Sequence, residues 1–133
     1  AVPPLQVDAM VLESVYPTIE RATENRLRKY LGPAGRWLVG PLLATMRLQL
    51  GVSAKELRPI DHIGAIKCPV LLINGEADAN TTREDAEFLY AAGAAPKELW
   101  LIPHAGHVDL HLAAKVDYER RVASFFREMI RRH

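Results

Sequence analysis

The chain has 133 residues, of which 49% are hydrophobic and 25% charged, and its 17 basic and 16 acidic residues leave a formal net charge of +1. This length fits a single domain, residues 1–133, and the balanced charge gives no reason to expect binding to nucleic acid. The one cysteine, Cys68, excludes an intrachain disulfide and a thiolate metal cluster, and it favours a reducing, cytoplasmic location.

The first part of the chain predicts a strand and then helices. Residues 8–14, DAMVLES, form an apolar run with polar ends, which is typical of a short buried strand. From residue 16 to about 57 the pattern is helical: ERATENRLRKY predicts one helix, residues 37–50 predict a second that is interrupted near Gly40 and Pro41, and Ser53 is a candidate N-cap. The apolar stretch 37–46 is much shorter than the roughly 20 residues of a membrane-spanning helix, so no membrane span is expected.

The second part of the chain predicts two more strands, each followed by a helix. CPVLLING, residues 68–75, is a continuous apolar run, and Thr81 with Glu84 forms a candidate capping box for a helix that ends near Gly93. KELWLIP, residues 97–103, predicts the third strand. The last helix, from about residue 115 to 132, is expected to present one apolar face, made of Val122, Phe125, Phe126, Met129 and Ile130.

This order of elements is typical of an α/β protein. We expect three layers, α/β/α, with a short parallel sheet of about three strands covered on both faces. The segment between the first two strands is much longer than the dozen or so residues that a parallel crossover needs. Residues 15–60 are therefore expected to form a helical, cap-like insertion.

Two loops with reactive side chains follow the second and third predicted strands. Residues 75–78, GEAD, contain two carboxylates, and residues 104–107, HAGH, contain two imidazoles. Ligands of open parallel sheets bind at the carboxyl ends of the strands, so we expect the two loops to be neighbours. A carboxylate that holds one ring nitrogen of a histidine leaves the other nitrogen free to accept a proton, as general-base catalysis requires.

The pattern IxxIKCPVLLINGEAD, then a helix, KELWLIPHAGHVDL and an amphipathic helix, resembles the C-terminal half of an α/β hydrolase. The similarity is to bacterial serine hydrolases related to esterases and S33-type peptidases. It implies that Asp78 is the acid and His107 the general base of a Ser-Asp-His triad. The sequence contains no G-x-S-x-G nucleophile motif, and neither Ser14 nor Ser53 has the flanking glycines. The resemblance therefore implies that the first five strands, the nucleophile and the oxyanion hole precede residue 1.

The same resemblance implies what the intact protein does. It would cleave a small-molecule ester, thioester or amide through an acyl-enzyme, with no metal ion or organic cofactor. The chain alone, without a nucleophile, is expected to be inactive. Its first strand is expected to self-associate or to pair with a missing N-terminal half.

Several alternatives stay open at this point. Glu76 is a rival for the acid, and His104, His107 and His111 could belong to a metal site, although Pro103 and Gly106 indicate a loop rather than the helix that an H-x-x-H site uses. Asp109 either caps the next helix or holds the loop. The apolar side chains Trp37, Leu42 and Met46 either line an acyl-binding pocket or pack against a neighbouring helix. A non-catalytic α/β binding module or a degenerate hydrolase is the alternative function.

Overall fold

The computed structural model describes residues 7–94 and 96–131. Its elements, in chain order, are β1 (Met10–Glu13), α1 (Ile19–Leu31), η1 (Gly32–Leu38), α2 (Val39–Leu50), η2 (Ala54–Glu56), η3 (Pro59–Asp61), η4 (Ile63–Ala65), β2 (Val70–Gly75), α3 (Arg83–Ala92), β3 (Lys97–Ile102), α4 (Leu110–Ala113) and α5 (Lys115–Ile130), where η denotes a 3₁₀ helix. No helix in these ranges is both long and apolar enough to cross a membrane.

The three strands form one parallel sheet in the order β1-β2-β3. In this register Leu72 of the central strand lies opposite Leu12 of β1 and Leu99 of β3. All six residues of β2 are buried, as a continuous apolar run predicts for a strand covered on both faces. The predicted α/β class and the short parallel sheet are confirmed.

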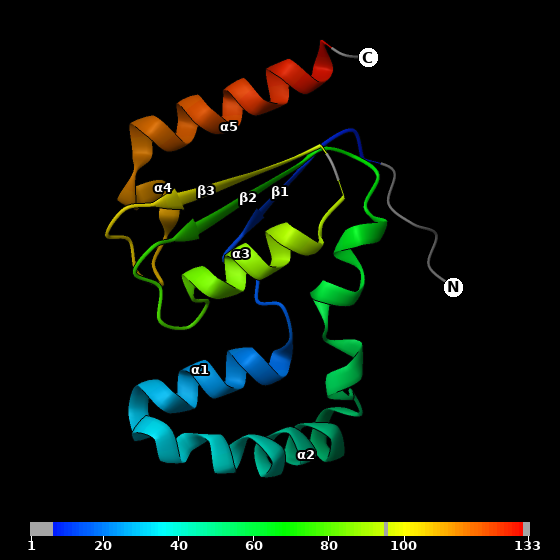
Figure 1. Ribbon diagram of the computed structural model, residues 1–133, viewed down its shortest axis with the longest axis vertical. Coiled ribbons are helices and arrows are strands. Elements are labelled where there is room, and N and C mark those ends of the chain that lie inside the picture. The colour runs from blue at the N-terminus through cyan, green and yellow to red at the C-terminus, as the bar shows by residue number, and fades with distance from the viewer. Residues whose placement is uncertain (1–6, 95, 132–133) are drawn as a thin grey trace.

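Helices cover both faces of the sheet, with α5 on one side and α3 on the other (Figure 1). Because side chains alternate along a strand, β2 supplies both cores. Leu71 and Ile73 pack on the α5 side with Phe125 and Met129, whereas Val70 and Leu72 pack on the α3 side with Leu89. The result is the expected three-layer α/β/α arrangement.

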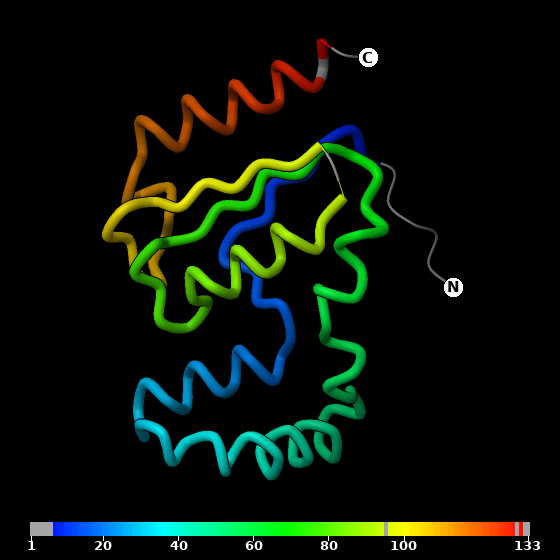
Figure 2. Tube along the Cα trace, in the orientation of Figure 1, coloured from blue at the N-terminus to red at the C-terminus, as the bar shows by residue number. Residues whose placement is uncertain are grey.

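The chain leaves the sheet after β1 and returns at β2 through residues 15–60, here called the helical segment (Figure 2). Its helix α1 begins after Thr18, whose side chain caps the backbone N–H of Arg21 at 3.2 Å. The interruption expected near Gly40 and Pro41 lies just before them, where the 3₁₀ helix η1 ends at Leu38 and α2 begins at Val39, and α2 runs without a break through Gly40 and Pro41. Both residues lie in its first turn, where a proline removes no intrahelical hydrogen bond.

A buried carboxylate holds the helical segment against the body. The Asp85 side chain of α3, 0% exposed, lies 2.6 Å from Arg21 Nε and accepts a 2.6 Å hydrogen bond from Asn25 Nδ2, both on α1. Asp85 also completes the capping box of α3, which pairs it with Thr82. The predicted box of Thr81 and Glu84 is therefore wrong by one position.

The remaining helix predictions hold with small corrections. Ser53 caps a single 3₁₀ turn in a capping box, and Asp109 caps α4, accepting from the backbone of Leu112 at 3.0 Å. Phe126 was assigned to the apolar face of α5, but it is 37% exposed. It lies at the border of the face whose centre is formed by Phe125 and Met129, because consecutive helical residues point about 100° apart.

Candidate functional site

Asp78 and His107 meet at the carboxyl end of the sheet. Asp78 lies in the loop after β2 and His107 in the loop after β3, and Asp78 Oδ2 is 2.9 Å from His107 Nδ1. The Asp78 side chain is 0% exposed, whereas that of His107 is 43% exposed. The contact is the one that the sequence predicts, although the catalytic role of the two residues stays a prediction.

The loop after β2 fixes the orientation of the Asp78 carboxylate. Its second oxygen, Oδ1, accepts hydrogen bonds from the backbone N–H groups of Asn80 at 2.8 Å and Thr81 at 3.0 Å. Both carboxylate oxygens are thus engaged, and Oδ2 is directed at the ring. A carboxylate facing Nδ1 favours the tautomer with its proton on that nitrogen, so Nε2 is left as the proton acceptor.

The two loops are joined by their backbones. Glu76 N–H donates to the Ile102 carbonyl at 3.0 Å, and Ala77 N–H donates to the Ala105 carbonyl at 2.9 Å. A Cβ atom at Gly75 would lie 2.4 Å from the Ala105 carbonyl oxygen, so this close approach requires glycine. The Gly in the GEAD stretch therefore sets the distance between the loops that present the acid and the histidine.

A second set of hydrogen bonds ties the end of β1 to the acid loop. The buried Asn74 donates from Nδ2 to the carbonyls of Gly75 at 3.0 Å and Thr81 at 2.9 Å. The Thr81 hydroxyl donates to the Ser14 carbonyl at 3.2 Å. The ends of the strands are thus connected around Asp78 by Asn74, which the sequence analysis did not single out, and by Thr81 and Ser14, which it considered for other roles.

The structure also bears on the two alternatives to the Asp78–His107 pair, namely Glu76 as the acid and a metal site at the histidines. Glu76 Oε1 lies 3.1 Å from Arg83 Nη1, and it is Asp78 that contacts the histidine. His111 lies on α4, where its Nε2 is 2.9 Å from Glu119 Oε1. Within residues 7–94 and 96–131, no group of three or more His, Cys, Asp or Glu side chains is placed to hold a metal ion.

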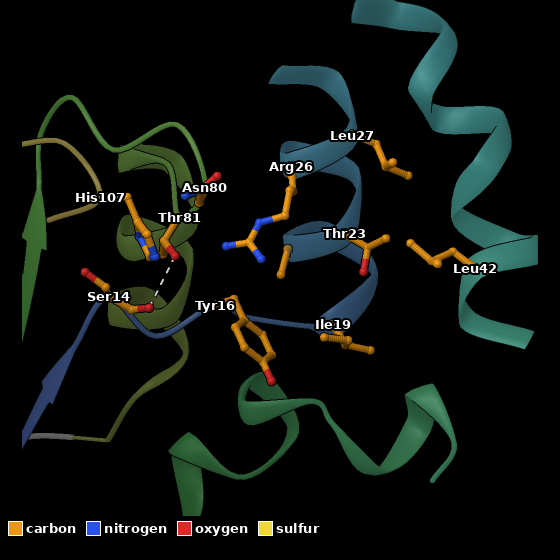
Figure 3. A pocket seen from close by; sticks show the side chains of 11 residues that line it. Ser14, Tyr16, Ile19, Thr23, Arg26, Leu27, Leu42, Asn80, Thr81 and His107 are labelled. Carbon is orange, nitrogen blue, oxygen red and sulfur yellow. Dashed lines mark hydrogen bonds between the residues drawn. The ribbon is translucent and has the colours of Figure 1, made fainter. Parts of the chain in front are cut away.

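A cavity of about 450 Å³ opens beside the histidine, between the strand ends and the helical segment (Figure 3). The residues that line it are Ser14, Tyr16, Ile19, Ala22, Thr23, Arg26, Leu27, Leu42, Asn80, Thr81 and His107. Of the three predicted substrate contacts, Leu42 is part of this lining, and Trp37 and Met46 are not. Trp37 is 73% exposed, with the Arg36 guanidinium 5.0 Å from its ring centre.

Five of the eleven residues that line the cavity come from one face of α1, which sequence reasoning missed as a binding surface. Its members are Ile19, Ala22, Thr23, Arg26 and Leu27. They follow the spacing of a helix face, i, i+3, i+4, i+7 and i+8. That spacing was visible in the sequence, but it could not show whether the face packs on the body or borders a cavity.

Two non-glycine residues with left-handed backbones lie at this end of the sheet. Ser14 has φ 46° directly after β1, and His104 has φ 61° after β3. Such conformations are uncommon and concentrate at functional sites. Here they turn the chain sharply where it leaves the strands, Ser14 toward the helical segment and His104 toward the loop that carries His107.

No family model matches this chain. The esterase PF2001 of Pyrococcus furiosus superposes with a TM-score of 0.70 at 20% identity, covering 95% of this chain and 47% of the esterase. The α/β hydrolase MGS-MChE2, from a metagenome of lagoon sediments at Mar Chica, Morocco, gives a TM-score of 0.58 at 18% identity over 92% of this chain and 51% of its own.

One curated relative is similar in sequence. The uncharacterized protein PA2218 of Pseudomonas aeruginosa is 36% identical over 93 residues, which are 69% of this chain and 22% of the relative. Its crystal structure superposes with a TM-score of 0.56. The chain thus spans about half the length of the solved structures and 22% of this relative.

Proposed function

We propose that this chain, which has the fold of the C-terminal half of an α/β hydrolase, supplies the acid and the histidine of a serine hydrolase. The observation that carries the proposal is the 2.9 Å contact between Asp78 Oδ2 and His107 Nδ1 at the carboxyl ends of adjacent strands. The intact protein would cleave an ester, thioester or amide by acyl transfer. The nucleophile and oxyanion hole would come from a part of the protein outside these residues.

The geometry supports a division of roles between the two residues. His107 Nε2 would take the proton of the serine as the hydroxyl attacks the substrate carbonyl, and it would then return that proton to the leaving group. Asp78, buried and held by two backbone N–H groups, would keep the ring oriented and stabilise the imidazolium. These steps use no metal ion or organic cofactor.

The helical segment, residues 15–60, would act as the cap that shapes the acyl site. Support comes from the cavity, which lies between this segment and His107 and includes Leu42. Contact of Trp37 and Met46 with substrate would need a closer approach of their part of the segment. We include a cytoplasmic location in the proposal, because a single free cysteine, Cys68, is compatible with a reducing compartment.

The open edge of the sheet at β1 supports the proposal that this half pairs with a partner. Within residues 7–94 and 96–131, β1 is an edge strand whose apolar residues Met10, Val11 and Leu12 pair only with β2. An N-terminal half would add its strands along β1. Without that half, the chain would self-associate through the same edge.

The decisive experiment replaces the histidine in the whole protein that contains this chain. We expect His107→Ala to lower kcat/KM for p-nitrophenyl butyrate by about a thousandfold or more, since the remaining groups retain only part of the catalysis. His111→Ala, which removes a histidine of α4 that contacts Glu119 of α5, is the matched control. A serine-directed fluorophosphonate should label the whole protein and leave this chain unlabelled.

Two outcomes would contradict the proposal. Full esterase activity in His107→Ala would remove the histidine from the mechanism. Stoichiometric labelling of Ser14 or Ser53 in this chain would show that the nucleophile lies inside it. A whole protein that neither reacts with the probe nor cleaves esters would instead support a binding module.

A further inference from the structure

One cationic side chain, that of Arg26, faces the cavity beside His107. Figure 3 shows the guanidinium pointing from α1 across the cavity toward the side where His107 and Thr81 lie. No aspartate or glutamate is among the described residues that line the cavity. With the histidine neutral, this wall therefore carries a single positive charge.

Arg26 differs from the other two arginines of α1. Arg21 Nε lies 2.6 Å from Asp85 of α3, and Arg28 donates at 3.2 Å to Oδ1 of Asn25, the α1 residue that bonds Asp85, so both have a polar partner. Arg26 has no hydrogen-bond, ion-pair or ring partner among the residues that the structure describes. Its position on α1 places it on the cavity face, and its charge is not used for holding the helix.

A substrate that fills the cavity would remove water from this guanidinium. Apolar neighbours such as Ile19 and Leu27 cannot replace that water, so an uncompensated cation there would weaken binding. A carboxylate compensates one positive charge and accepts two parallel hydrogen bonds from a guanidinium. A phosphate dianion would bring one negative charge more than the wall can match.

We propose that Arg26 binds a carboxylate on the substrate, so that the preferred substrates are acyl compounds with an anionic end. This inference rests on the proposed function, because it assumes that the acyl group occupies the cavity beside His107. It adds a substrate class and a specificity-determining residue. The same helix that closes the cavity thus selects the charge of what enters it.

The test compares two esters of equal chain length in the whole protein. These are the mono-p-nitrophenyl ester of glutaric acid, which is anionic, and p-nitrophenyl valerate, which is neutral. We expect Arg26→Gln to lower the anionic-to-neutral ratio of kcat/KM by about 10- to 100-fold, the usual effect of losing a charged hydrogen bond. Arg26→Lys, which keeps the charge without the bidentate geometry, should lower the ratio by less.

Lys29→Gln is the matched control for the charge of the helix. Lys29 lies on α1 outside the cavity lining, with its ammonium 5.7 Å from the Tyr30 ring centre. An unchanged ratio in Arg26→Gln, or an equal fall in Lys29→Gln, would overturn the proposal. Either result would mean that a group elsewhere in the whole protein neutralises the charge of Arg26, or that Arg26 acts on the substrate only through long-range electrostatics.

A binding measurement separates this inference from the proposed function. If the whole protein cleaves neither ester, the hydrolase proposal fails, and glutarate itself is titrated while the His107 ring is followed by NMR. A Kd at least about tenfold weaker in Arg26→Gln than in the wild type would uphold the carboxylate site. Equal affinities, or tighter binding of inorganic phosphate than of glutarate, would overturn it.

Discussion

The α/β body, made of the sheet with α3 and α5, and the helical segment are stabilised in different ways. Every residue of β2 is buried between two helices, whereas α2 has no buried residue and leaves Leu48 87% and Leu50 69% exposed. The segment is joined to the body through the polar contacts of Asp85 and through Val15 and Ile60, which pack at its two ends against the core on the α3 side. The candidate catalytic pair belongs to the body, and the segment reaches its acid loop through the hydrogen bond from Asn25 to the Asn80 carbonyl.

This difference matters for how the cavity is built. Its chemical side, with His107 and Thr81, is fixed by backbone hydrogen bonds between neighbouring loops. Its binding side, with Arg26 and Leu42, belongs to helices held by few long-range contacts. Elements with few buried apolar contacts open at low free-energy cost, so the binding side is the part expected to adapt to substrate.

The largest expected effect comes from removing a core side chain of the body. Leu89 on α3 is 0% exposed, and Leu89→Ala should lower the free energy of unfolding by about 2–5 kcal/mol. The matched change in the helical segment, Leu48→Ala, should stay within about 0.5 kcal/mol. Urea unfolding of the two variants measures the contrast, and equal losses would show that α2 also belongs to the core.

The next effect should be local to the helical segment. Asn25 donates to Asp85 at 2.6 Å and to the Asn80 carbonyl at 3.1 Å, so Asn25→Ala leaves one buried and one half-buried acceptor with one partner fewer each. We expect the opening of α1 to become easier by about 1–3 kcal/mol. Hydrogen exchange of α1 amides should speed up while that of β2 amides stays unchanged. Equal acceleration in both would mean that segment and body unfold as one unit.

The edge strand β1 is where we propose that this chain pairs with a partner. If the isolated chain associates through β1, Val11→Lys should weaken that association by about tenfold or more, because a lysine on an edge strand opposes pairing. Light scattering over a concentration series measures this, and circular dichroism confirms that the variant is folded. Val116→Lys, at a residue of α5 that is 76% exposed, is the control. A monomeric wild type at high concentration would contradict the proposed pairing.

The smallest expected effect is a pH dependence inside the body. Tyr118 of α5 donates a hydrogen bond to Glu13 of β1, and burial, together with that carboxylate, raises the pKa of Tyr118 from 10.0 to about 12. The folded state therefore favours the neutral phenol. This contribution to stability is complete below pH 10.0 and is lost as the pH rises toward about 12. Over this range, the free energy of unfolding of the wild type should approach that of Tyr118→Phe. A difference between the two free energies that does not change with pH would contradict the assignment.

Much of the body follows from local pattern in the sequence. Apolar runs predicted the strands β2 and β3, and the placement of GEAD and HAGH after two consecutive parallel strands predicted that Asp78 and His107 would meet. Strand direction alone brings such loops together, because the carboxyl ends of parallel strands lie at one edge. The capping box of α3 was missed by one residue, since Thr81 and Thr82 both suit an N-cap and only tertiary contacts separate them.

The sequence by itself thus determined the fold class, the sheet and the candidate pair, which depend on short-range periodicity and chain order. Tertiary structure alone decided that Asn25 contacts Asp85, 60 residues away, and that Arg26 faces a cavity whereas Arg21 faces a buried carboxylate. The physical reason is that a helix pattern shows which residues share a face but not what that face meets. What it meets depends on how α1 packs on α3, which is set by contacts far apart in the chain.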